Sequence, residues 1–359
     1  MRNIIQLVEA YEKKFAPAGT PRELRVAHRE IGKEISKLLT EGKLDATKVS
    51  FRHLWESLVV SQDLEENLTS SAFPNISGQI ISKVMIDAYE AFPKEADKLM
   101  RTVPSKLKTS RVVGWTALGT VERVQERQDY PELQPPDEKL QTIKNYKYGG
   151  ILSLTKEDIF FDQTGELVER AKQIGEEGAR YRQELMFAAL CDNGGNSLSG
   201  ADLYASGNSN LLTTNPLGTA GWEAVRKALF GKKDERNKPI WVFGDRPTMI
   251  VPPALVSTAE KLQKNEYGDL GTANLDVNLA RGVFDIVVNP YWTANETSWW
   301  YGAFKRQFRW EEVWPVEVFM RVGEDTEEGF KADVIQQHKC SFYGGAGAAD
   351  TKFVYENQA

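Results

Sequence analysis

The segment from residue 111 to residue 150 constrains the fold of this chain more than any other. Its two ends, Arg111–Trp115 and Thr142–Leu154, have the composition of strands, and the residues between them are highly charged, with three prolines near the tip. A polar two-stranded excursion buries little apolar surface, and an isolated hairpin is only marginally stable in water. We therefore expect this segment to lie on another surface, either its own domain or a neighbouring chain.

The strongest helix signal follows, after a short helix that begins at Thr155-Lys156-Glu157-Asp158. From Thr164 or Gly165 onward, apolar and small residues recur at alternating spacings of four and three, which predicts a single stripe along one helix face. The stripe consists of Leu167, Ala171, Ile174, Gly178, Tyr181, Leu185 and Ala188. Asn193-Gly194-Gly195 ends this helix, which is about 40 Å long and is predicted to lie as a spine across a sheet.

The N-terminal part of the chain predicts a separate helical segment over residues 1–68. Thr20-Pro21-Arg22-Glu23 is a capping box with proline at the first helical position, and a second helix begins near Ser50. Two interpretations stay open: a small subdomain packed on the main body, or a detachable segment that binds a partner. Residues 69–110 predict a short helix that Pro93 ends, followed by an extended arm.

After the spine, the sequence predicts a mixed α/β portion and then a set of returning strands. Residues 192–221 are rich in Gly, Ser, Asn and Thr and predict a long loop. Helices are expected at Trp222–Phe230 and from Pro252-Pro253 to Leu262. Strands are expected at Ile240–Phe243, Thr248–Val251, Val283–Val288, Thr297–Phe304, Val316–Val322, Phe330–Tyr343 and Lys352–Tyr355.

Charge and cysteine content narrow the class of protein. The 45 Lys and Arg residues and 51 Asp and Glu residues give a net charge of −6, a poor overall match for a phosphate backbone that still allows a local basic patch. Cys191 and Cys340 are not in a CxxC pair, which favours a reducing compartment. Without an N-terminal apolar run or a long apolar stretch, the sequence predicts a soluble protein of the cytosol.

Motifs for catalysis, cofactors and metals do not emerge from the sequence. His28, His53 and His338 have no metal-ligand spacing and are predicted to be surface or core residues. Cys191 is predicted to be a buried thiol and not a nucleophile. Adjacent acidic pairs such as Glu176-Glu177 are expected to solvate a surface, although a glycosidase-type carboxylate pair stays open. We predict no cofactor, no metal and no catalytic residue.

Large aromatic residues crowd between residues 292 and 314, with Lys305, Arg306 and Arg309 among them. One interpretation is a stacking platform for sugars or nucleotides. The other is a core or subunit interface rich in aromatics. The set comprises Trp292, Trp299, Trp300, Tyr301, Phe304, Phe308, Trp310 and Trp314.

The order of these parts resembles the HK97-type major capsid proteins of tailed bacteriophages. Residues 148–158 are similar to the strand that leads into the spine helix of that family, and residues 179–190 are similar to the spine helix itself. Thr248–Leu255, Val287–Trp292 and Trp299–Tyr301 are similar to its A-domain strands. The resemblance spans residues 70–345, with the Mu-type major head subunits as the nearest subgroup.

The resemblance implies an α+β, HK97-like capsid fold with an N-terminal helical segment, an extended arm, an E-loop hairpin, a P-domain with a long spine helix and an α/β A-domain. The implied division of the chain is an N-terminal helical segment at 1–68, an N-arm at 69–110, an E-loop at 111–150, a P-domain spine helix with the following loop at 151–221, an A-domain at 222–304, and returning P-domain strands with a C-terminal tail at 305–359.

The resemblance also implies a non-enzymatic subunit that assembles as hexamers and pentamers into an icosahedral shell around double-stranded DNA, bound non-specifically on the inner face. Portal, scaffolding and decoration proteins are implied partners, and contact with a membrane is not implied. The implied location is the virion, after assembly in the host cytoplasm. The expected intersubunit contacts lie in the E-loop: Arg123, Arg127, Tyr130, Glu132, Glu138 and Lys139. Two alternatives stay open, an encapsulin-like shell around cargo protein and a carbohydrate-active hydrolase.

Overall fold

The structure is a computed structural model. It describes residues 72–114, 123–124, 126, 140–161, 166–192, 203–234, 237–240, 242, 246–266, 278–292, 296–322 and 327–359. The helices predicted within residues 1–68 lie outside these described residues. The chain divides into two compact units: unit 1 holds the residues up to Pro93, Lys147–Tyr181 and Trp314–Tyr343, and unit 2 holds Lys94–Tyr146, Arg182–Val313 and Gly344–Ala359.

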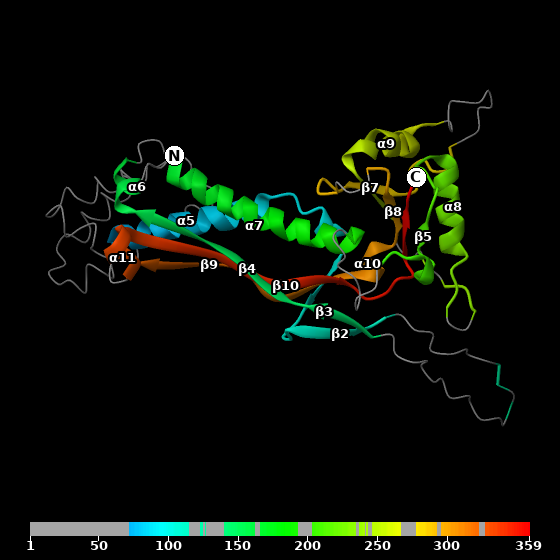
Figure 1. Cartoon of the computed structure of the whole chain (residues 1–359), viewed down its shortest axis with the longest axis horizontal. Helices are drawn as coiled ribbons and strands as arrows, with labels where there is room; N and C mark the ends of the chain where they lie inside the picture. The colour runs from blue at the N-terminus through cyan, green and yellow to red at the C-terminus, as the bar shows by residue number, and fades with distance from the viewer. Residues whose placement is uncertain are drawn as a thin grey trace. The chain divides into compact units, whose positions relative to one another are not determined.

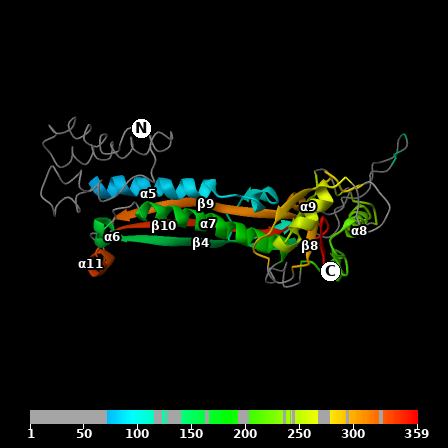
Figure 2. The same cartoon turned by 90° about the horizontal axis from the view of Figure 1, so that it is seen from above.

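Unit 1 is a layer of helices on a layer of strands. Its helices are α5 (Ala72–Ala91) and the part of α7 (Glu166–Cys191) that ends at Tyr181. Its strands belong to β4 (Tyr146–Thr155), β9 (Phe308–Val322) and β10 (Val334–Ala348), in the order β9-β10-β4. Figures 1 and 2 show α5 and α7 on the same face of these strands. The predicted spine on a sheet is therefore present, and α5 is longer than the short helix that we expected.

Glycines set the distances between the layers of unit 1. A Cβ atom at Gly175 of α7 would lie 2.2 Å from the carbonyl oxygen of Met85 in α5, and one at Gly78 of α5 would lie 1.7 Å from the sulfur of Met320 in β9. Real Cβ atoms do not approach other atoms so closely, so the backbones of α7 and α5 touch directly at Gly175, and the Met320 side chain lies against the backbone of α5 at Gly78. The close contact between α5 and α7 depends on the missing side chain.

The buried face of α7 differs from the predicted stripe. Ala171, Gly175 and Ala179 are buried at a constant spacing of four, whereas Tyr181 of the predicted stripe is 40% exposed. Leu167 and Ala171 of the predicted stripe are buried, and its other members except Tyr181 are half-buried: Ile174, Gly178, Leu185 and Ala188. The centre of the buried face is shifted toward Gly175 and Ala179, where small residues let α5 approach.

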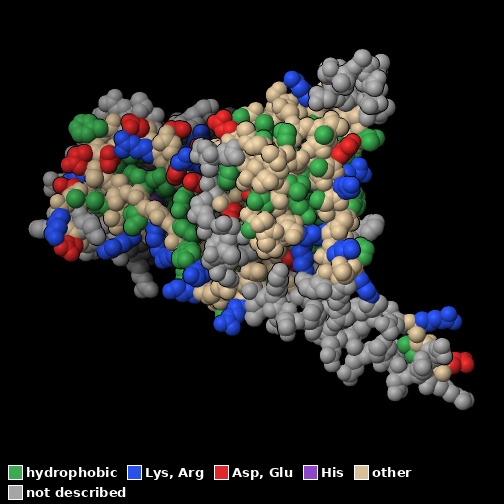
Figure 3. Space-filling model, turned by 45° about the vertical axis from the view of Figure 1, so that its right-hand side comes forward, with side chains coloured by type: hydrophobic (Ala, Val, Ile, Leu, Met, Phe, Trp, Pro, Cys, Tyr) green, Lys and Arg blue, Asp and Glu red, His purple; other side chains and the backbone are tan. Residues whose placement is uncertain are grey.

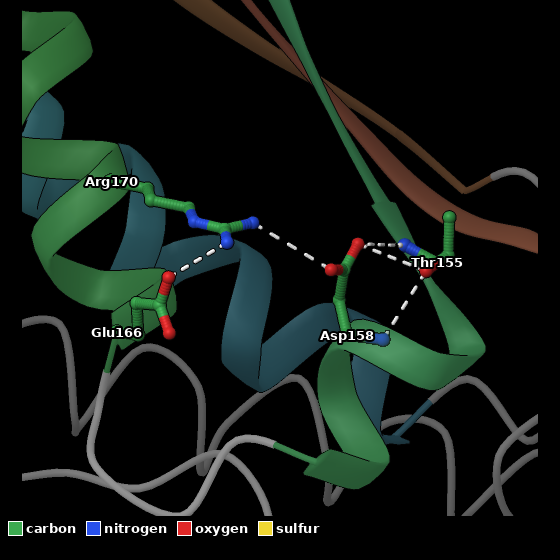
Figure 4. Close-up of polar contacts among 4 residues, drawn as sticks. All are labelled: Thr155, Asp158, Glu166 and Arg170. Carbon is green, nitrogen blue, oxygen red and sulfur yellow. Dashed lines mark hydrogen bonds and ion pairs between the residues drawn. The ribbon is translucent and has the colours of Figure 1, made fainter.

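The short helix α6 (Lys156–Phe161) begins where the sequence predicted it. The Thr155 backbone N–H donates to Asp158 Oδ2 over 3.1 Å, and the Asp158 backbone N–H donates to Thr155 Oγ1 over 3.2 Å, which forms a reciprocal capping box (Figure 4). Arg170 of α7 lies 3.6 Å from Asp158 Oδ1 and donates to Glu166 over 2.7 Å. These contacts join α6 to the end of β4 and to the first turns of α7.

Unit 2 contains a five-stranded mixed sheet. The strand order is β5 (Leu211–Leu212), β11 (Val354–Asn357), β8 (Trp299–Gly302), β6 (Thr248–Val251) and β7 (Asp285–Val288). Strands β6 and β7 are parallel, as are β5 and β11, and β8 runs antiparallel to both of its neighbours. The helices are α8 (Thr219–Phe230), α9 (Val256–Lys264) and α10 (Phe304–Gln307), with single turns η2 (Ala96–Lys98), η3 (Ser206–Asn208) and η4 (Pro253–Leu255).

The core of unit 2 is aromatic. Trp222, Phe284, Trp299, Tyr301 and Phe353 belong to one buried cluster with aliphatic residues of α8, α9 and β6. Of the aromatic set between residues 292 and 314, every member except Trp314 is buried, and Trp314 packs on Tyr343 with ring centroids 5.3 Å apart. The core interpretation of this set is confirmed, because buried rings cannot serve as a stacking platform for a ligand.

Several predicted boundaries differ from the structure. Phe330 was expected in a strand but lies in α11 (Glu327–Ala332), and β10 begins only at Val334. Strand β9 begins at Phe308, before the predicted Val316, and it continues through Pro315 near the sheet edge, where a missing N–H is tolerated. Within the described part of 240–243, no strand forms; the nearest pairing is an isolated bridge between Lys233 and Pro239.

Candidate functional site

The predicted excursion begins and ends as a two-stranded antiparallel ribbon, composed of β2 (Thr109–Val113) and β3 (Leu140–Lys144). The register runs from Thr109 opposite Lys144 to Val113 opposite Leu140. Ser110, Val112 and Ile143 are buried on one face, whereas Thr109, Arg111, Thr142 and Lys144 are exposed on the other. The ribbon thus has one face that packs on the rest of unit 2 and a polar face that is exposed.

The buried face of the ribbon packs on glycines of β10. A Cβ atom at Gly345 would lie 2.4 Å from the carbonyl oxygen of Lys144, and one at Gly347 would lie 2.6 Å from Cγ1 of Ile143. Gly344 is equally tight, with a Cβ position 2.6 Å from Cζ2 of Trp310. Side chains at Gly345 and Gly347 would displace the ribbon, so these two glycines fix its distance from β10, whereas Gly344 allows the close approach of Trp310.

Asn145 connects the end of the ribbon to β9. Its side chain is 1% exposed, and its Nδ2 donates to the carbonyl oxygen of Leu107 over 2.8 Å and to Glu311 Oε2 over 3.1 Å. Its backbone N–H donates to the carbonyl oxygen of Lys108 over 2.9 Å. Because Glu311 lies in β9 and is itself buried, this amide joins three backbone segments at one point.

The arm that precedes the ribbon is also fixed within unit 2. Strand β1 (Arg101–Pro104) pairs in parallel with β9, from Arg101 opposite Arg309 to Pro104 opposite Glu312. Arg182, at the start of the unit 2 part of α7, donates to Asp97 over 2.8 Å, and its guanidinium lies 5.1 Å from the ring centroid of Trp310. Both ends of the excursion therefore start from ordered, well-packed backbone.

Five of the six predicted contact residues lie outside the part of the chain that the structure describes. Arg123 is exposed. The other five predicted residues lie outside the described residues: Arg127, Tyr130, Glu132, Glu138 and Lys139. Their role as intersubunit contacts stays a prediction.

Both cysteines are buried within their units, whereas Glu177 of the acidic pair Glu176-Glu177 is exposed. Cys191 is 1% exposed and accepts a hydrogen bond from Asn289 Nδ2 over 3.3 Å. Burial raises the pKa of this thiol far above its usual range, so the sulfur stays protonated, and the buried-thiol prediction is confirmed. Cys340 is also buried and free.

His338 is buried in β10 of unit 1, with its Nε2 atom 3.2 Å from Gln336 Oε1. Burial lowers the pKa of this imidazole to about 4, so the ring is neutral near pH 7. The prediction of a core histidine is confirmed for His338. His28 and His53 lie outside the described residues.

Across the described ranges, no group of three His, Cys, Asp or Glu side chains is placed to hold a metal ion. Within that same part of the chain, no helix is long and apolar enough to cross a bilayer.

A long helix across a sheet, a mixed sheet with an aromatic core and a two-stranded excursion define the α+β capsid fold. The structure is similar to one described as "Capsid of native GTA particle computed with C5 symmetry", with a TM-score of 0.51 and 12% identity, covering 75% of this chain and 91% of that chain. At this identity the likeness shows the fold alone.

Two further matches have lower TM-scores. The capsid structure of Cyanophage P-SCSP1u has a TM-score of 0.48 and 12% identity, covering 73% of this chain and 86% of that chain. A virus-like particle from Pyrococcus furiosus has a TM-score of 0.45 and 10% identity, covering 77% of this chain and 97% of that chain.

The family is shown by the sequence itself. The profile of the family described as "Phage capsid protein" matches residues 139–357, which is more than half of the chain. The chain therefore belongs to this family and is a structural subunit of a phage capsid shell, located in the virion. None of the curated proteins matches it. The resemblance to HK97-type capsid proteins is thus confirmed, while the Mu-type subgroup stays a prediction.

Sequence reasoning missed the residues that hold the ribbon in place. Asn145 and the glycines at 345 and 347 carry no catalytic or apolar signal. A cluster of glycines inside a predicted strand is, however, a recognised sign of close backbone approach. That sign in Gly344-Gly345-Ala346-Gly347 would have pointed to this contact.

Proposed function

We propose that this chain is a non-enzymatic major capsid protein that assembles through hexamers and pentamers into a closed icosahedral shell around double-stranded DNA. The observation that carries the proposal is the ribbon. Its two strands are held firmly by Asn145 and the β10 glycines, yet they lead into a long polar segment with no core of its own. A segment of that kind gains most by lying on another subunit.

The division of the chain into capsid parts follows from the same proposal. Residues 111–150 act as the E-loop, and Arg123, Arg127, Tyr130, Glu132, Glu138 and Lys139 supply contacts to a neighbouring copy. Residues 69–110 act as the N-arm and residues 1–68 as an N-terminal segment. Residues 151–221 and 305–359 build the P-domain with its tail, and residues 222–304 build the A-domain.

The remaining partners are proposed from the needs of a container. An acidic chain with a net charge of −6 binds DNA weakly, which suits an inner face past which packed DNA must move. Portal, scaffolding and decoration proteins are further partners, and assembly takes place in the host cytoplasm.

The proposal is tested by expressing the full-length chain and following its assembly by sedimentation velocity and negative-stain microscopy. We expect closed particles, or rings of five and six copies that convert into them. The contents of the particles then distinguish a phage shell from an encapsulin-like shell. A phage shell holds nuclease-protected DNA, whereas an encapsulin-like shell holds cargo protein. A chain that remains a monomer or dimer at all concentrations would contradict the proposal.

A matched variant tests the ribbon itself. Replacing residues 116–138 with a short Gly-Ser loop keeps β2, β3 and their contacts to β10. We expect the thermal melt followed by circular dichroism to change little and assembly to be lost. Unchanged assembly would show that the excursion is not the subunit contact.

A further inference from the structure

The two strands of the ribbon are tied to neighbouring residues of β9. On the side of β2, the backbone N–H of Ser105 donates to the carbonyl oxygen of Glu312 over 2.9 Å. On the side of β3, the side chain of Asn145 donates to Glu311 Oε2 over 3.1 Å. Two such points fix the direction in which the ribbon leaves β9. The first is a backbone contact, so only the second depends on a pair of side chains.

The Asn145 amide can adopt only one orientation. Its Nδ2 lies 2.8 Å from the carbonyl oxygen of Leu107 and 3.1 Å from Glu311 Oε2, and both neighbours are hydrogen-bond acceptors. Its Oδ1 is buried against Gly345, where a Cβ atom would be 2.6 Å away, and within the described residues it has no donor. An ionised carboxylate at position 145 would therefore face two oxygen atoms and could make neither bond.

Glu311 is a buried carboxylate. Its side chain is 3% exposed, it accepts from Asn145 Nδ2, and its Oε1 lies 3.8 Å from Nε of Arg309. Burying a carboxylate can cost more free energy than such partners return. A neutral, apolar pair of similar size would stabilise unit 2 at least as well. The carboxylate is therefore better explained by the position it imposes on Asn145 than by stability.

The surface around this pair is basic. Residues 101–114 and 140–146 contain no Asp or Glu. Figure 3 shows Lys and Arg side chains along the lower margin of the described surface. Like charges at the base of the ribbon repel one another, and the Glu311 carboxylate beside Asn145 offsets part of that repulsion. The exposed cations of these two stretches include Lys106, Lys108, Arg111 and Lys144.

We propose that Glu311 is the positioning residue of the excursion: by holding Asn145, it fixes the direction in which the ribbon leaves unit 2. In a shell of identical copies, every excursion must leave its subunit in the same direction for particles of one size to form. The pair then decides the geometry of assembly and contributes little to the stability of unit 2. This inference rests on the proposed function for its effect on particles, but not for the contact itself.

The test exchanges amide and carboxyl in the full-length chain. Asn145→Asp places two carboxyl groups side by side, Glu311→Gln keeps an acceptor for Asn145, and the double variant restores a hydrogen bond with donor and acceptor reversed. Glu312→Gln is the matched control, because this neighbouring side chain lies 3.8 Å from Arg182. Circular dichroism melts establish that each variant is folded, and hydrogen exchange followed by mass spectrometry reports on residues 140–144.

We expect Asn145→Asp to lower the protection of the ribbon amides at least about tenfold, which is the weight of one hydrogen bond to a charged group. Glu311→Gln should lose less, and Glu312→Gln should lose nothing. The double variant regains protection relative to Asn145→Asp, because the two positions are coupled through one bond. A role in packing alone would not be rescued by reversing the pair.

Particle size is the second readout, measured by sedimentation velocity and negative-stain microscopy. Particles of the Asn145→Asp variant should spread over several sizes, and the double variant should narrow the distribution again. The melts of all variants should stay close to that of the unaltered chain. If Asn145→Asp does not fold, Asn145→Ala removes the same bonds without adding a charge. Unfolding of the Ala variant as well would overturn the inference, because the pair would then serve stability.

Failure of this inference can be told from failure of the proposed function. If the unaltered chain forms no particles, the proposed function fails, while hydrogen exchange still decides whether Glu311 holds the ribbon. If ribbon protection is unchanged in Asn145→Asp, or is not regained in the double variant, the inference is overturned. If protection is lost but the particles keep a single size, the pair does not position the excursion, and the inference is overturned as well.

Discussion

The interiors of the two units of this subunit are packed in different ways. Unit 2 buries large aromatic side chains, among them Trp222, Trp299 and Phe353, in one cluster. In unit 1 the helices approach each other and the sheet through Gly175 and Gly78, and buried polar groups, including His338, lie between the layers. We therefore expect unit 2 to lose stability when its buried side chains are made smaller. We expect unit 1 to lose stability when its buried residues are made larger or become charged.

The largest expected effect is in the aromatic core of unit 2. Trp299 is fully buried and its Nε1 donates to the carbonyl oxygen of Asn215 over 3.0 Å. Trp299→Ala should lower the free energy of unfolding by about 3–5 kcal/mol, measured by urea denaturation. The control is Trp314→Ala, which removes a half-exposed ring and should cost less than about 1 kcal/mol. Similar losses at both positions would contradict the aromatic-core account.

The next effect is a dependence of unit 1 on pH. The pKa of His338 is lowered by burial from 6.5 to about 4, so the unfolded chain binds the proton more readily than the folded one. Its contribution to stability is complete above pH 6.5 and is lost as the pH falls toward 4, by up to about 3 kcal/mol. His338→Leu should flatten this part of the stability–pH curve, followed by denaturation at pH 4.5, 5.5 and 7.

Unit 2 should respond in the other direction. Burial raises the pKa of the Glu356 carboxyl in β11, and the nearby charge of Asp192 raises it further. The stabilising contribution of this group is present at low pH and is lost as the pH rises through its folded-state pKa. Hydrogen exchange should therefore show that lowering the pH from 7 to 5 reduces the protection of backbone amides in α5 more than in β11. An equal loss of protection in both elements would contradict this difference between the units.

A pair of glycines in α7 isolates the backbone contact of unit 1. Gly175→Ala places a methyl group against the Met85 carbonyl and should destabilise the unit by about 1–3 kcal/mol. At Gly178 the nearest atom to a new Cβ would be 3.8 Å away, so Gly178→Ala should be neutral or stabilising by up to about 1 kcal/mol through helix propensity. Thermal melts of the two variants measure this difference in stability. Equal effects of the two substitutions would refute the close contact between α5 and α7.

The smallest expected effect is at the start of α6. Thr155→Ala removes the hydroxyl that accepts the Asp158 backbone N–H and should cost about 1 kcal/mol. Thr155→Ser keeps the hydroxyl and should recover most of that loss in the same thermal melt. A Ser variant as unstable as the Ala variant would show that the capping bonds do not matter.

The sequence alone predicted the parts of the fold that follow from periodicity and turn chemistry. Strand β6, the start of α6 and helix α7 lie where apolar spacing and capping residues placed them. The contact of Gly175 with α5 was missed because the apolar spacing alone does not show where a second helix approaches; the predicted Tyr181 is exposed instead. Asn145 was missed because its partners, Leu107 and Glu311, lie far away in sequence.

The capsid class was predictable for a different reason. No single motif identified it; the order of the parts did, and the family match over residues 139–357 agrees with that order. The order of the parts along the chain could not show how the ribbon is held in place. That depends on the contact of β3 with Gly345 and Gly347 of β10, which forms only in the folded protein.

The central claim is that the excursion of one copy lies on another copy in a closed shell. The most direct measurement is cryo-electron microscopy of particles formed by the full-length chain, at a resolution that traces residues 111–150. The account predicts that this segment leaves its own subunit after β2, contacts a neighbouring subunit and returns through β3. A map in which the segment folds back on its own chain, or in which the particles are not shells, would contradict it.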